Sequence, residues 1–293
     1  MPRFDERVVL VTGGSSGIGF ATAKAFLQEG AKVAVTGRSA SRLAKATQEL
    51  RRHGRVLGIR GDVSKAEDAK RFVIRTERAL GPLDVLVNNA GIYLQKSTER
   101  MTEHEWDSVL DVNLKGTFLC TKYALPGMIR RKHGNIVNVA SDSGLVATPL
   151  SSAYCASKGG MVLFTRVLAV DHAKDGIRVN AICPGEVDTP MLDRDAAASG
   201  LGRARYYRRL VASIPQKRAA QPDEIARAIL FIASDETPFM TGAAVSVDGG
   251  WTAICTASHA RDAHGPRRSS DAAPPIVIGP SRTTRSRDRS SRV

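Results

Sequence analysis

The chain has 293 residues, of which 42% are hydrophobic and 26 are glycine, so we expect a buried core and exclude global disorder. No apolar run approaches the ~18–20 residues that a membrane-spanning helix needs, and the N-terminus lacks the pattern of a secretory signal. The net charge is +14, but no nucleic-acid-binding motif accompanies it, so we interpret the basicity as incidental.

Seven short runs rich in β-branched residues alternate with stretches long enough for crossover helices. In chain order, the expected strands are Val8–Thr12, Lys32–Thr36, Val56–Arg60, Leu83–Val87, Asn135–Ala140, Arg178–Cys183 and Ala244–Val247. Most are continuously apolar, which is typical of strands covered on both faces. The pattern predicts an α/β fold: a single-domain, doubly wound, Rossmann-like parallel sheet of about seven strands with helices on both faces.

The composition changes near residue 255. Residues 1–255 are expected to form the one domain, and residues 256–293 are basic and rich in Pro, Ser and Arg. Such a segment buries too little apolar surface to offset the entropy of ordering, so we predict a disordered tail.

The first expected strand runs into a glycine-rich turn, Thr12-Gly13-Gly14-Ser15-Ser16-Gly17-Ile18-Gly19. Glycines permit a tight turn and let backbone N–H groups approach a pyrophosphate at a helix N-terminus. A glycine turn alone is weak evidence, because it also joins strands to helices without any ligand. Between the first strand and the first helix of an α/β pattern, it predicts dinucleotide binding by Gly13, Ser15, Ser16, Gly17, Ile18 and Gly19.

A buried amide is expected in the helical stretch Glu103–Phe118. The residues that share one face of this stretch are Trp106, Val109, Leu110 and Leu114. Asn113 falls within that face, and a buried amide needs hydrogen-bond partners. Asn113 therefore either bonds neighbouring backbone or anchors a water molecule.

Tyr154 and Lys158 stand four apart in the helix-like stretch Ala153–Ala169, so both project from one face. A phenol has a pKa of about 10, and a neighbouring ammonium favours the phenolate, which would make Tyr154 a proton donor and acceptor. Ser141 follows an expected strand at the sheet edge where ligands bind, and its hydroxyl can hydrogen-bond a carbonyl. Ser143 is the rival position, and an ordinary turn serine is the alternative for both.

Together these elements resemble the short-chain dehydrogenase/reductase family in its ordinary single-domain type. From Val8 to about Trp251, the matching residues are the T-G-x-x-x-G-I-G turn, Asp62-Val63, Asn88-Asn89-Ala90-Gly91, Asn113, Ser141, Tyr154-x-x-x-Lys158, Pro184-Gly185 and Thr189. The resemblance implies reversible hydride transfer between a nicotinamide cofactor and a small-molecule carbonyl or secondary alcohol.

The resemblance also implies roles for four catalytic residues. Tyr154 would transfer the proton, Lys158 would bind the nicotinamide ribose and lower the pKa of Tyr154, and Ser141 would orient the carbonyl. Asn113 would hold water that relays protons to the lysine.

The remaining implied contacts are with the cofactor. Asp62 and Val63 would flank the adenine, although a cap is the alternative for Asp62, and Ser64 with Glu67 form the better capping box. Thr189 would contact the nicotinamide carboxamide and can also cap the next helix. The other implied contacts are Asn89, Ala90, Gly91, Tyr154, Lys158, Pro184, Gly185 and Val187.

The end of the second strand predicts which cofactor is used. Enzymes that take NAD(H) usually place an acidic residue there, which accepts from the ribose 2′-hydroxyl and repels a 2′-phosphate. Gly37 stands at that position and Arg38 follows it; a guanidinium can bind phosphate with two parallel bonds, although a solvent-facing arginine is the alternative. Ser16 stands where many phosphate-preferring relatives carry a second basic residue. We predict a preference for NADP(H), with NAD(H) as the weaker alternative.

Two further features concern partners. Gly159 and Gly160 each disfavour a helix by roughly 1 kcal/mol relative to Ala, which close packing of another helix would explain. By resemblance, this helix pairs with its own copy in a homodimer or homotetramer. Residues 190–214 are the expected substrate lid, and their arginines would attract an acidic substrate, although we favour a solvated charged helix. The arginines concerned are Arg194, Arg203, Arg205, Arg208 and Arg209, beside Asp193 and Asp195.

Two other functions fit part of the pattern. A relative that epimerises or dehydrates nucleotide sugars would show a shorter-spaced glycine turn and an added C-terminal domain. A catalytically idle nucleotide-binding regulator, with a tail that binds nucleic acid, would not need all four catalytic residues. The four cysteines are scattered and lack a C-x-x-C pair, so we expect no metal site and a cytoplasmic enzyme without membrane or nucleic-acid partners.

Overall fold

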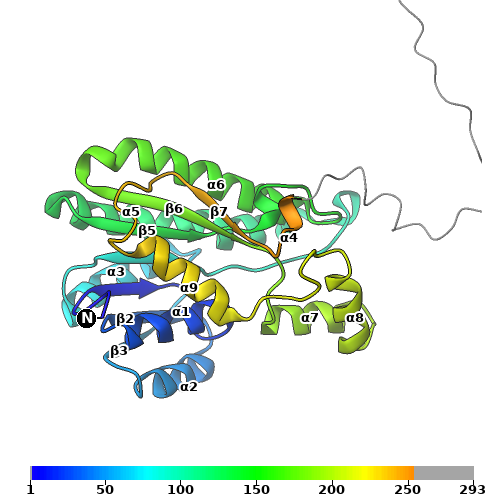
Figure 1. Cartoon of the computed structure of the whole chain (residues 1–293), viewed down its shortest axis with the longest axis horizontal. Helices are drawn as coiled ribbons and strands as arrows, with labels where there is room; N and C mark the ends of the chain where they lie inside the picture. Colours follow the sequence, from blue (N-terminus) through cyan, green and yellow to red (C-terminus); the bar gives the residue numbers. More distant parts are fainter. Residues whose placement is uncertain (1, 254–293) are drawn as a thin grey trace, which may run out of the picture. The chain divides into compact units, whose positions relative to one another are not determined.

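A computed structural model of the chain describes residues 2–253; the predicted tail over residues 256–293 lies outside them. The described residues form one parallel sheet with the strand order β3-β2-β1-β4-β5-β6-β7 (Figure 1). The strands are β1 (Val8–Val11), β2 (Lys32–Gly37), β3 (Val56–Arg60), β4 (Val85–Asn88), β5 (Gly134–Val139), β6 (Ile177–Pro184) and β7 (Ala244–Val247). All seven expected strands are confirmed, with ends that differ by at most two residues.

Helices cover both faces of the sheet, as the doubly wound pattern predicts. They are α1 (Gly17–Gln28), α2 (Ala40–Leu50), α3 (Ala66–Leu80), α4 (Glu103–Leu110), α5 (Gly116–Arg131), α6 (Ser152–His172), α7 (Pro190–Ala198), α8 (Arg203–Val211) and α9 (Pro222–Ala233). Val9 and Val11 of β1 pack with α1, α2 and α9, whereas Val8 and Leu10 pack with α3, α5 and α6. This alternation follows from the two-residue period of a strand.

The expected helix over Glu103–Phe118 is interrupted. Between α4 and α5 lies a π-helical segment, Asp111–Lys115, whose wider turns break the regular helical period. The prediction that Trp106 lies on the buried face is therefore wrong, since Trp106 is 37% exposed. Val109 of the same predicted face and Asn113 are buried.

A buried hydrogen-bond network joins the strands and helices around the middle of the sheet. Asn88 of β4 donates through Nδ2 to Asn138 Oδ1 of β5 at 2.9 Å and to Thr121 Oγ1 of α5 at 3.1 Å. Asn138 donates in turn to Thr165 Oγ1 of α6 at 2.9 Å. The network thus fixes α6 against β5.

The close packing that the glycine pair predicts occurs within the chain. A Cβ on Gly160 would lie 2.9 Å from the end of the Leu114 side chain, so α6 packs closely on the π-helical segment here and a larger residue would require Leu114 to move. By contrast, a Cβ on Gly159 would meet nothing nearer than 3.7 Å.

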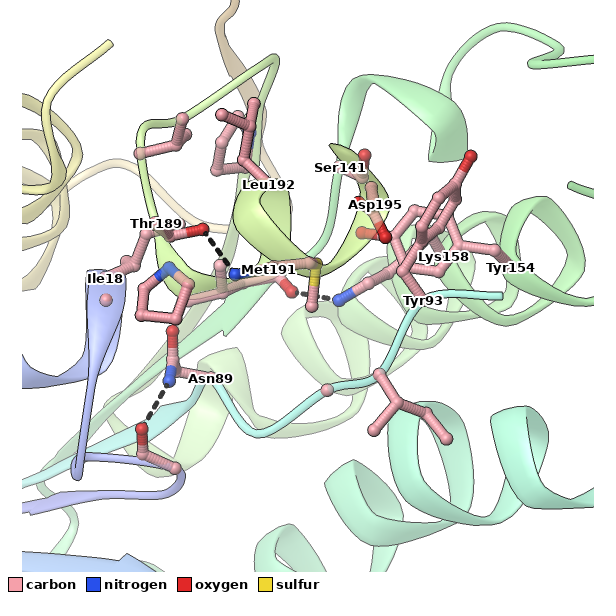
Figure 2. A pocket seen from close by; sticks show the side chains of 18 of the residues that line it. Ile18, Asn89, Tyr93, Ser141, Tyr154, Lys158, Thr189, Met191, Leu192 and Asp195 are labelled. Atoms are coloured by element: carbon pink, nitrogen blue, oxygen red, sulfur yellow. Dashed lines mark hydrogen bonds between the residues drawn. The ribbon is translucent and has the colours of Figure 1, made fainter. Parts of the chain in front are cut away.

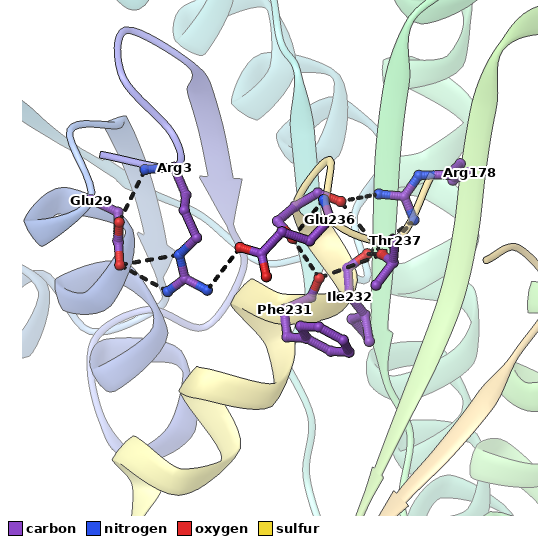
Figure 3. Close-up of polar contacts among 8 residues, drawn as sticks. Arg3, Glu29, Arg178, Phe231, Ile232, Glu236 and Thr237 are labelled. Atoms are coloured by element: carbon purple, nitrogen blue, oxygen red, sulfur yellow. Dashed lines mark hydrogen bonds and ion pairs between the residues drawn. The ribbon is translucent and has the colours of Figure 1, made fainter. Parts of the chain in front are cut away.

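Part of the positive charge of the chain stabilises the end of the sheet away from the strands' carboxyl ends (Figure 3). Arg178 of β6 donates to the carbonyls of Ile232 at 3.1 Å, Ser234 at 2.8 Å and Met240 at 3.0 Å, which holds the end of α9. The guanidinium of Arg178 is therefore used inside the fold.

Candidate active site

A pocket of about 710 Å³ opens at the carboxyl ends of the central strands. The predicted site residues that line it are Gly13, Ser15, Ser16, Gly17, Ile18, Arg38, Asp62, Val63, Asn89, Ala90, Gly91, Ser141, Tyr154, Lys158, Pro184, Gly185, Val187 and Thr189. Gly19 and Asn113 belong to the predicted set but do not line the pocket. Figure 2 shows Ser141 and Tyr154 on one side and Ile18 and Asn89 on the other. Motifs far apart in the sequence therefore meet in one cavity.

The glycine turn brings backbone atoms to the pocket. Gly13 has a φ of +67°, and a Cβ there would lie 2.9 Å from the Ala90 Cα. A Cβ on Gly19 would lie 2.5 Å from the Gly13 carbonyl oxygen, which explains a glycine that does not itself line the pocket. α1 begins after Ser16 with no side-chain cap and no acidic residue in its first turn. Its first N–H groups therefore receive no side-chain cap, which leaves them available to an anion such as a pyrophosphate.

Asn89 and Thr12 join this turn to the end of β4. Thr12 Oγ1 accepts from the N–H groups of Asn89 at 3.0 Å and Ala90 at 3.1 Å, and Asn89 Nδ2 donates to the Thr12 carbonyl at 2.9 Å. These bonds hold the two loops that form the floor of the pocket.

Asp62 lines the pocket after β3, beside Val63. Its Oδ1 accepts from the Ser64 N–H at 3.0 Å and from the Ser64 hydroxyl at 2.8 Å. The predicted capping box of Ser64 with Glu67 is wrong: α3 begins after Lys65 with no side-chain cap, because the Ser64 hydroxyl is directed to Asp62.

Tyr154 and Lys158 lie one turn apart on α6. Lys158 is 4% exposed, and its Nζ donates to the Val139 carbonyl at 2.7 Å and lies 5.6 Å from the centre of the Tyr154 ring. Burial lowers the pKa of Lys158 to about 8. Desolvation raises the pKa of Tyr154 above its ordinary value, against the opposing effect of a hydrogen bond with Ser141. The expected lowering of the Tyr154 pKa is not found, because desolvation outweighs the polar contacts.

Ser141 follows β5 and is buried. Its hydroxyl donates to Asp142 Oδ1 at 2.8 Å, and its Oγ accepts from the Ser143 N–H at 3.2 Å. The rival, Ser143, also lines the pocket and shares a 2.7 Å hydrogen bond with Thr148 Oγ1. Both serines are therefore held by the turn, with Ser141 adjoining Tyr154.

Asn113 lies in the π-helical segment and is fully buried. Its Oδ1 accepts from the Ile92 N–H at 2.8 Å, and its Nδ2 donates to the Ile92 carbonyl and to Ser157 Oγ, both at 3.0 Å. The side chain thus bonds neighbouring backbone, which is the plainer of its two predicted roles.

Thr189 performs the capping role that its sequence position predicts. Its Oγ1 accepts from the Met191 N–H at 3.3 Å at the start of α7, where Pro190 takes the first position. Because Thr189 also lines the pocket, the cap places its side chain beside the site.

Several lining residues escaped the sequence analysis, namely Tyr93, Arg42, Asp142 and Glu186, whereas Asp195 and Tyr206 lie within the expected lid. Asp142 directly follows the predicted Ser141, and Glu186 lies between the predicted Gly185 and Val187. Their position next to predicted site residues is the one sequence signal that could have indicated that these two residues line the pocket.

Neither a metal site nor a membrane-spanning helix is found among residues 2–253. No three His, Cys, Asp or Glu side chains of this range are placed to hold a metal ion. Likewise, none of its helices is long and apolar enough to cross a membrane.

Known proteins resemble this chain in sequence and in fold. A family model described as enoyl-(acyl carrier protein) reductase matches residues 13–252. The 2-(S)-hydroxypropyl-CoM dehydrogenase 3 of Xanthobacter autotrophicus is 42% identical over 253 residues, covering 86% of this chain and 99% of the relative. A 3-oxoacyl-(acyl-carrier-protein) reductase of Thermotoga maritima is 39% identical over 252 residues, covering 85% and 98%. The crystal structure of levodione reductase matches with a TM-score of 0.84 at 34% identity, covering 86% of this chain and 100% of that one. The chain therefore belongs to the short-chain dehydrogenase/reductase family, whose enzymes act on alcohol and carbonyl groups.

Proposed function

We propose that this oxidoreductase prefers NADP(H) and interconverts a small-molecule ketone and a secondary alcohol, with Tyr154 as proton donor and acceptor. The observation that carries the proposal is the shared pocket, which is lined by the glycine turn, Arg38, Ser141, Tyr154 and Lys158 together. The names of the relatives agree on alcohol and carbonyl chemistry but not on one substrate.

In this reaction, each side chain of the site would have a different role. A bound nicotinamide dinucleotide supplies or accepts the hydride. A phenol with a pKa of about 10 is protonated at neutral pH, and desolvation raises the pKa of Tyr154 further, so Tyr154 carries the proton that a carbonyl oxygen would accept. Ser141 orients that oxygen, and Lys158 binds the ribose from the floor of the pocket. In the proposal, Asn113 also anchors a water molecule, as the resemblance implies, in addition to the hydrogen bonds that its side chain makes to Ile92 and Ser157.

The NADP(H) preference rests on the end of β2. Arg38 lines the pocket there, and Arg42, one turn into α2, lines it as well. A Cβ on Gly37 would lie 3.1 Å from Ser15 Oγ, so the glycine turn packs close to the position where an acidic side chain would stand. Two guanidinium groups at this end, and a glycine rather than an acidic residue at position 37, favour a 2′-phosphate.

The proposal is tested by turnover of a panel of ketones and secondary alcohols, followed by cofactor absorbance at 340 nm, the wavelength at which the reduced cofactor absorbs. We expect cofactor-dependent turnover of at least one member of the panel. The alternative, an idle regulator, predicts cofactor binding without turnover and a gel shift of nucleic acid by the full chain at physiological salt. Those two results together would show that the protein is a regulator and not an enzyme.

We also propose that the enzyme forms a homodimer or homotetramer through α5 and α6. Phe118, Leu163, Val167 and Val170 expose 44%, 61%, 49% and 80% of their surface on these two helices. A group of exposed apolar side chains of this kind marks an interaction surface.

Leu163→Glu combined with Val167→Glu is expected to dissociate the oligomer, because two carboxylates would be buried at the contact. Sedimentation velocity at micromolar protein concentration measures the oligomeric state. Ile74→Glu, at a residue 49% exposed on α3, is the matched control and should leave the oligomer intact. A monomeric unmodified protein, or an unchanged double variant, contradicts this surface.

A cytoplasmic location is part of the same proposal. Among the described residues, Cys120, Cys155 and Cys183 are free thiols, and this agrees with a reducing compartment. Cell fractionation followed by activity measurement checks the location.

A further inference from the structure

The ring of the candidate proton donor packs against a second tyrosine, to which the proposed reaction gives no role. Tyr93, from the loop after β4, lies edge-on to Tyr154, with the ring centroids 4.9 Å apart and an angle of 86° between the planes. Figure 2 shows the two side chains together, on the side of the pocket that also holds Ser141. An edge-to-face contact favours one relative orientation of two rings. The orientation of the Tyr154 ring therefore depends on how firmly Tyr93 is held.

The hydroxyl of Tyr93 is bound to the residue that precedes α6. Its oxygen lies 3.0 Å from Ser151 Oγ. Ser151 is 1% exposed, and its single hydroxyl proton is directed to the Pro149 carbonyl at 3.2 Å. Tyr93 is therefore the donor in its bond with Ser151. Its side chain lines the pocket while its hydroxyl proton is directed to Ser151.

The backbone on both sides of Tyr93 is fixed as well. On one side, Asn113 Oδ1 accepts from the Ile92 N–H at 2.8 Å, and Asn113 Nδ2 donates to the Ile92 carbonyl at 3.0 Å. On the other side, the Lys96 N–H donates to the Leu150 carbonyl at 2.7 Å. The loop that carries Tyr93 is thus bound at one end to the π-helical segment and at the other to the residues before α6.

The same amide side chain is linked to the backbone of Tyr154. Asn113 Nδ2 also donates to Ser157 Oγ at 3.0 Å, and the Ser157 hydroxyl donates to the Tyr154 carbonyl at 2.8 Å. Asn113 and Ser157 are both fully buried, so water does not compete for these bonds. One buried amide therefore fixes both the loop that carries Tyr93 and the turn of α6 that carries Tyr154.

We propose that Tyr93 is a positioning residue, whose ring, held by Ser151, keeps the Tyr154 hydroxyl beside Ser141, where a carbonyl oxygen would bind. This inference rests on the proposed function, in which Tyr154 transfers the proton. Tyr93 acts through Tyr154 and not on the substrate. Because proton transfer requires the donor within hydrogen-bond reach of the oxygen, a displaced Tyr154 ring lowers kcat without weakening the binding of the cofactor.

Ser151→Ala tests this role from outside the pocket, because Ser151 is not among the residues that line it. The variant leaves the Tyr93 hydroxyl without its acceptor. We expect kcat on the best substrate of the ketone and alcohol panel to fall at least about threefold, a factor within the range that one side-chain hydrogen bond contributes. The KM for NADPH and the melting temperature should change little.

Ser152→Ala is the matched control for Ser151→Ala. The Ser152 oxygen is buried and has no hydrogen-bond partner among the described residues. Its loss should therefore leave kcat unchanged. A fall in kcat that is equal in the two variants would show a general disturbance of the start of α6 and would overturn the positioning role.

A double-mutant cycle isolates the bond between Tyr93 and Ser151. Tyr93→Phe removes the hydroxyl and keeps the ring, so it should lower kcat by about the same factor as Ser151→Ala. The two changes together should lower kcat no further than either alone, because both remove one bond. Additive losses, or an unchanged kcat in Ser151→Ala, overturn the proposal. Should Ser151→Ala fail to fold, an unchanged kcat in Tyr93→Phe overturns it alone.

A spectroscopic measurement separates this inference from the proposed reaction. In protein labelled with 3-fluorotyrosine, the ¹⁹F resonance of Tyr154 is identified by its loss in Tyr154→Phe. We expect this resonance to shift or broaden in Ser151→Ala and to keep its position in Ser152→Ala, with no substrate present. If it does so although no alcohol or ketone is turned over, Tyr93 positions Tyr154 and the proposed reaction fails. If it stays unchanged in Ser151→Ala, the positioning role is refuted whatever the turnover.

Discussion

Replacing Tyr154 with phenylalanine is expected to lower kcat at least about a hundredfold, measured on the best substrate of the ketone and alcohol panel. The change removes the hydroxyl alone, and general acid–base catalysis contributes at least about that factor. Because the phenyl ring still packs against Tyr93 and the Lys158 contact with Val139 is untouched, NADPH should bind nearly as before. Steady-state kinetics give the rate, and cofactor fluorescence gives the affinity.

The control for this change is Tyr123→Phe, because Tyr123 lies on α5 and does not line the pocket. It loses the same hydroxyl and should keep the rate of the unmodified enzyme. Turnover of Tyr154→Phe within a few-fold of that rate would assign the proton transfer to another group. In that case Tyr93, whose hydroxyl shares a 3.0 Å bond with Ser151, is the next candidate.

Combining Gly37→Asp with Arg38→Ser is expected to reverse the cofactor preference. The ratio of kcat/KM with NADPH to that with NADH should fall by about two to three orders of magnitude, because a bidentate phosphate contact is lost and a repelling carboxylate is gained. A Cβ at position 37 would lie 3.1 Å from Ser15 Oγ, so that hydroxyl must move by a few tenths of an ångström. Kinetics with both cofactors measure the ratio.

Gly37→Ala separates the volume of the new side chain from its charge and should change the ratio only slightly. Arg42→Ser tests the second cation at the same end of the pocket. A higher kcat/KM with NADH than with NADPH in the unmodified enzyme would show that Arg38 does not select the phosphate.

The strands could be predicted closely because their continuous apolar character depends only on local sequence. Trp106 shows where that reasoning fails: a regular helical period was assumed across a segment that is partly π-helical. Ser64 has the residue type of a helix cap, but its hydroxyl donates a hydrogen bond to Asp62, two positions earlier, at 2.8 Å. The Ser64 error arises from competition between nearby hydrogen-bond partners, which residue preferences do not resolve.

The candidate site was predictable where its residues follow strands, because parallel strands bring their carboxyl ends to one edge. The carboxylates that line the pocket were not predictable. Asp193 and Asp195 stand two apart on one short helix, yet Asp193 pairs with Arg203 outside the pocket and Asp195 lines it. Which way each points depends on how α7 packs against α8, and no motif records that.

The hydrogen bonds between β4, β5 and α6 have a consequence for how this enzyme can change. They bind the strand before Ser141 to the helix that carries Tyr154, whereas α7 and α8 pack chiefly on each other. Substitutions in α7 and α8 can therefore change the substrate specificity without moving Tyr154. A search for new specificity should leave the buried hydrogen-bond network around Asn88 and Asn138 unchanged. The positions to randomise are pocket-lining residues of the two helices: Met191, Leu192, Asp195, Tyr206 and Leu210.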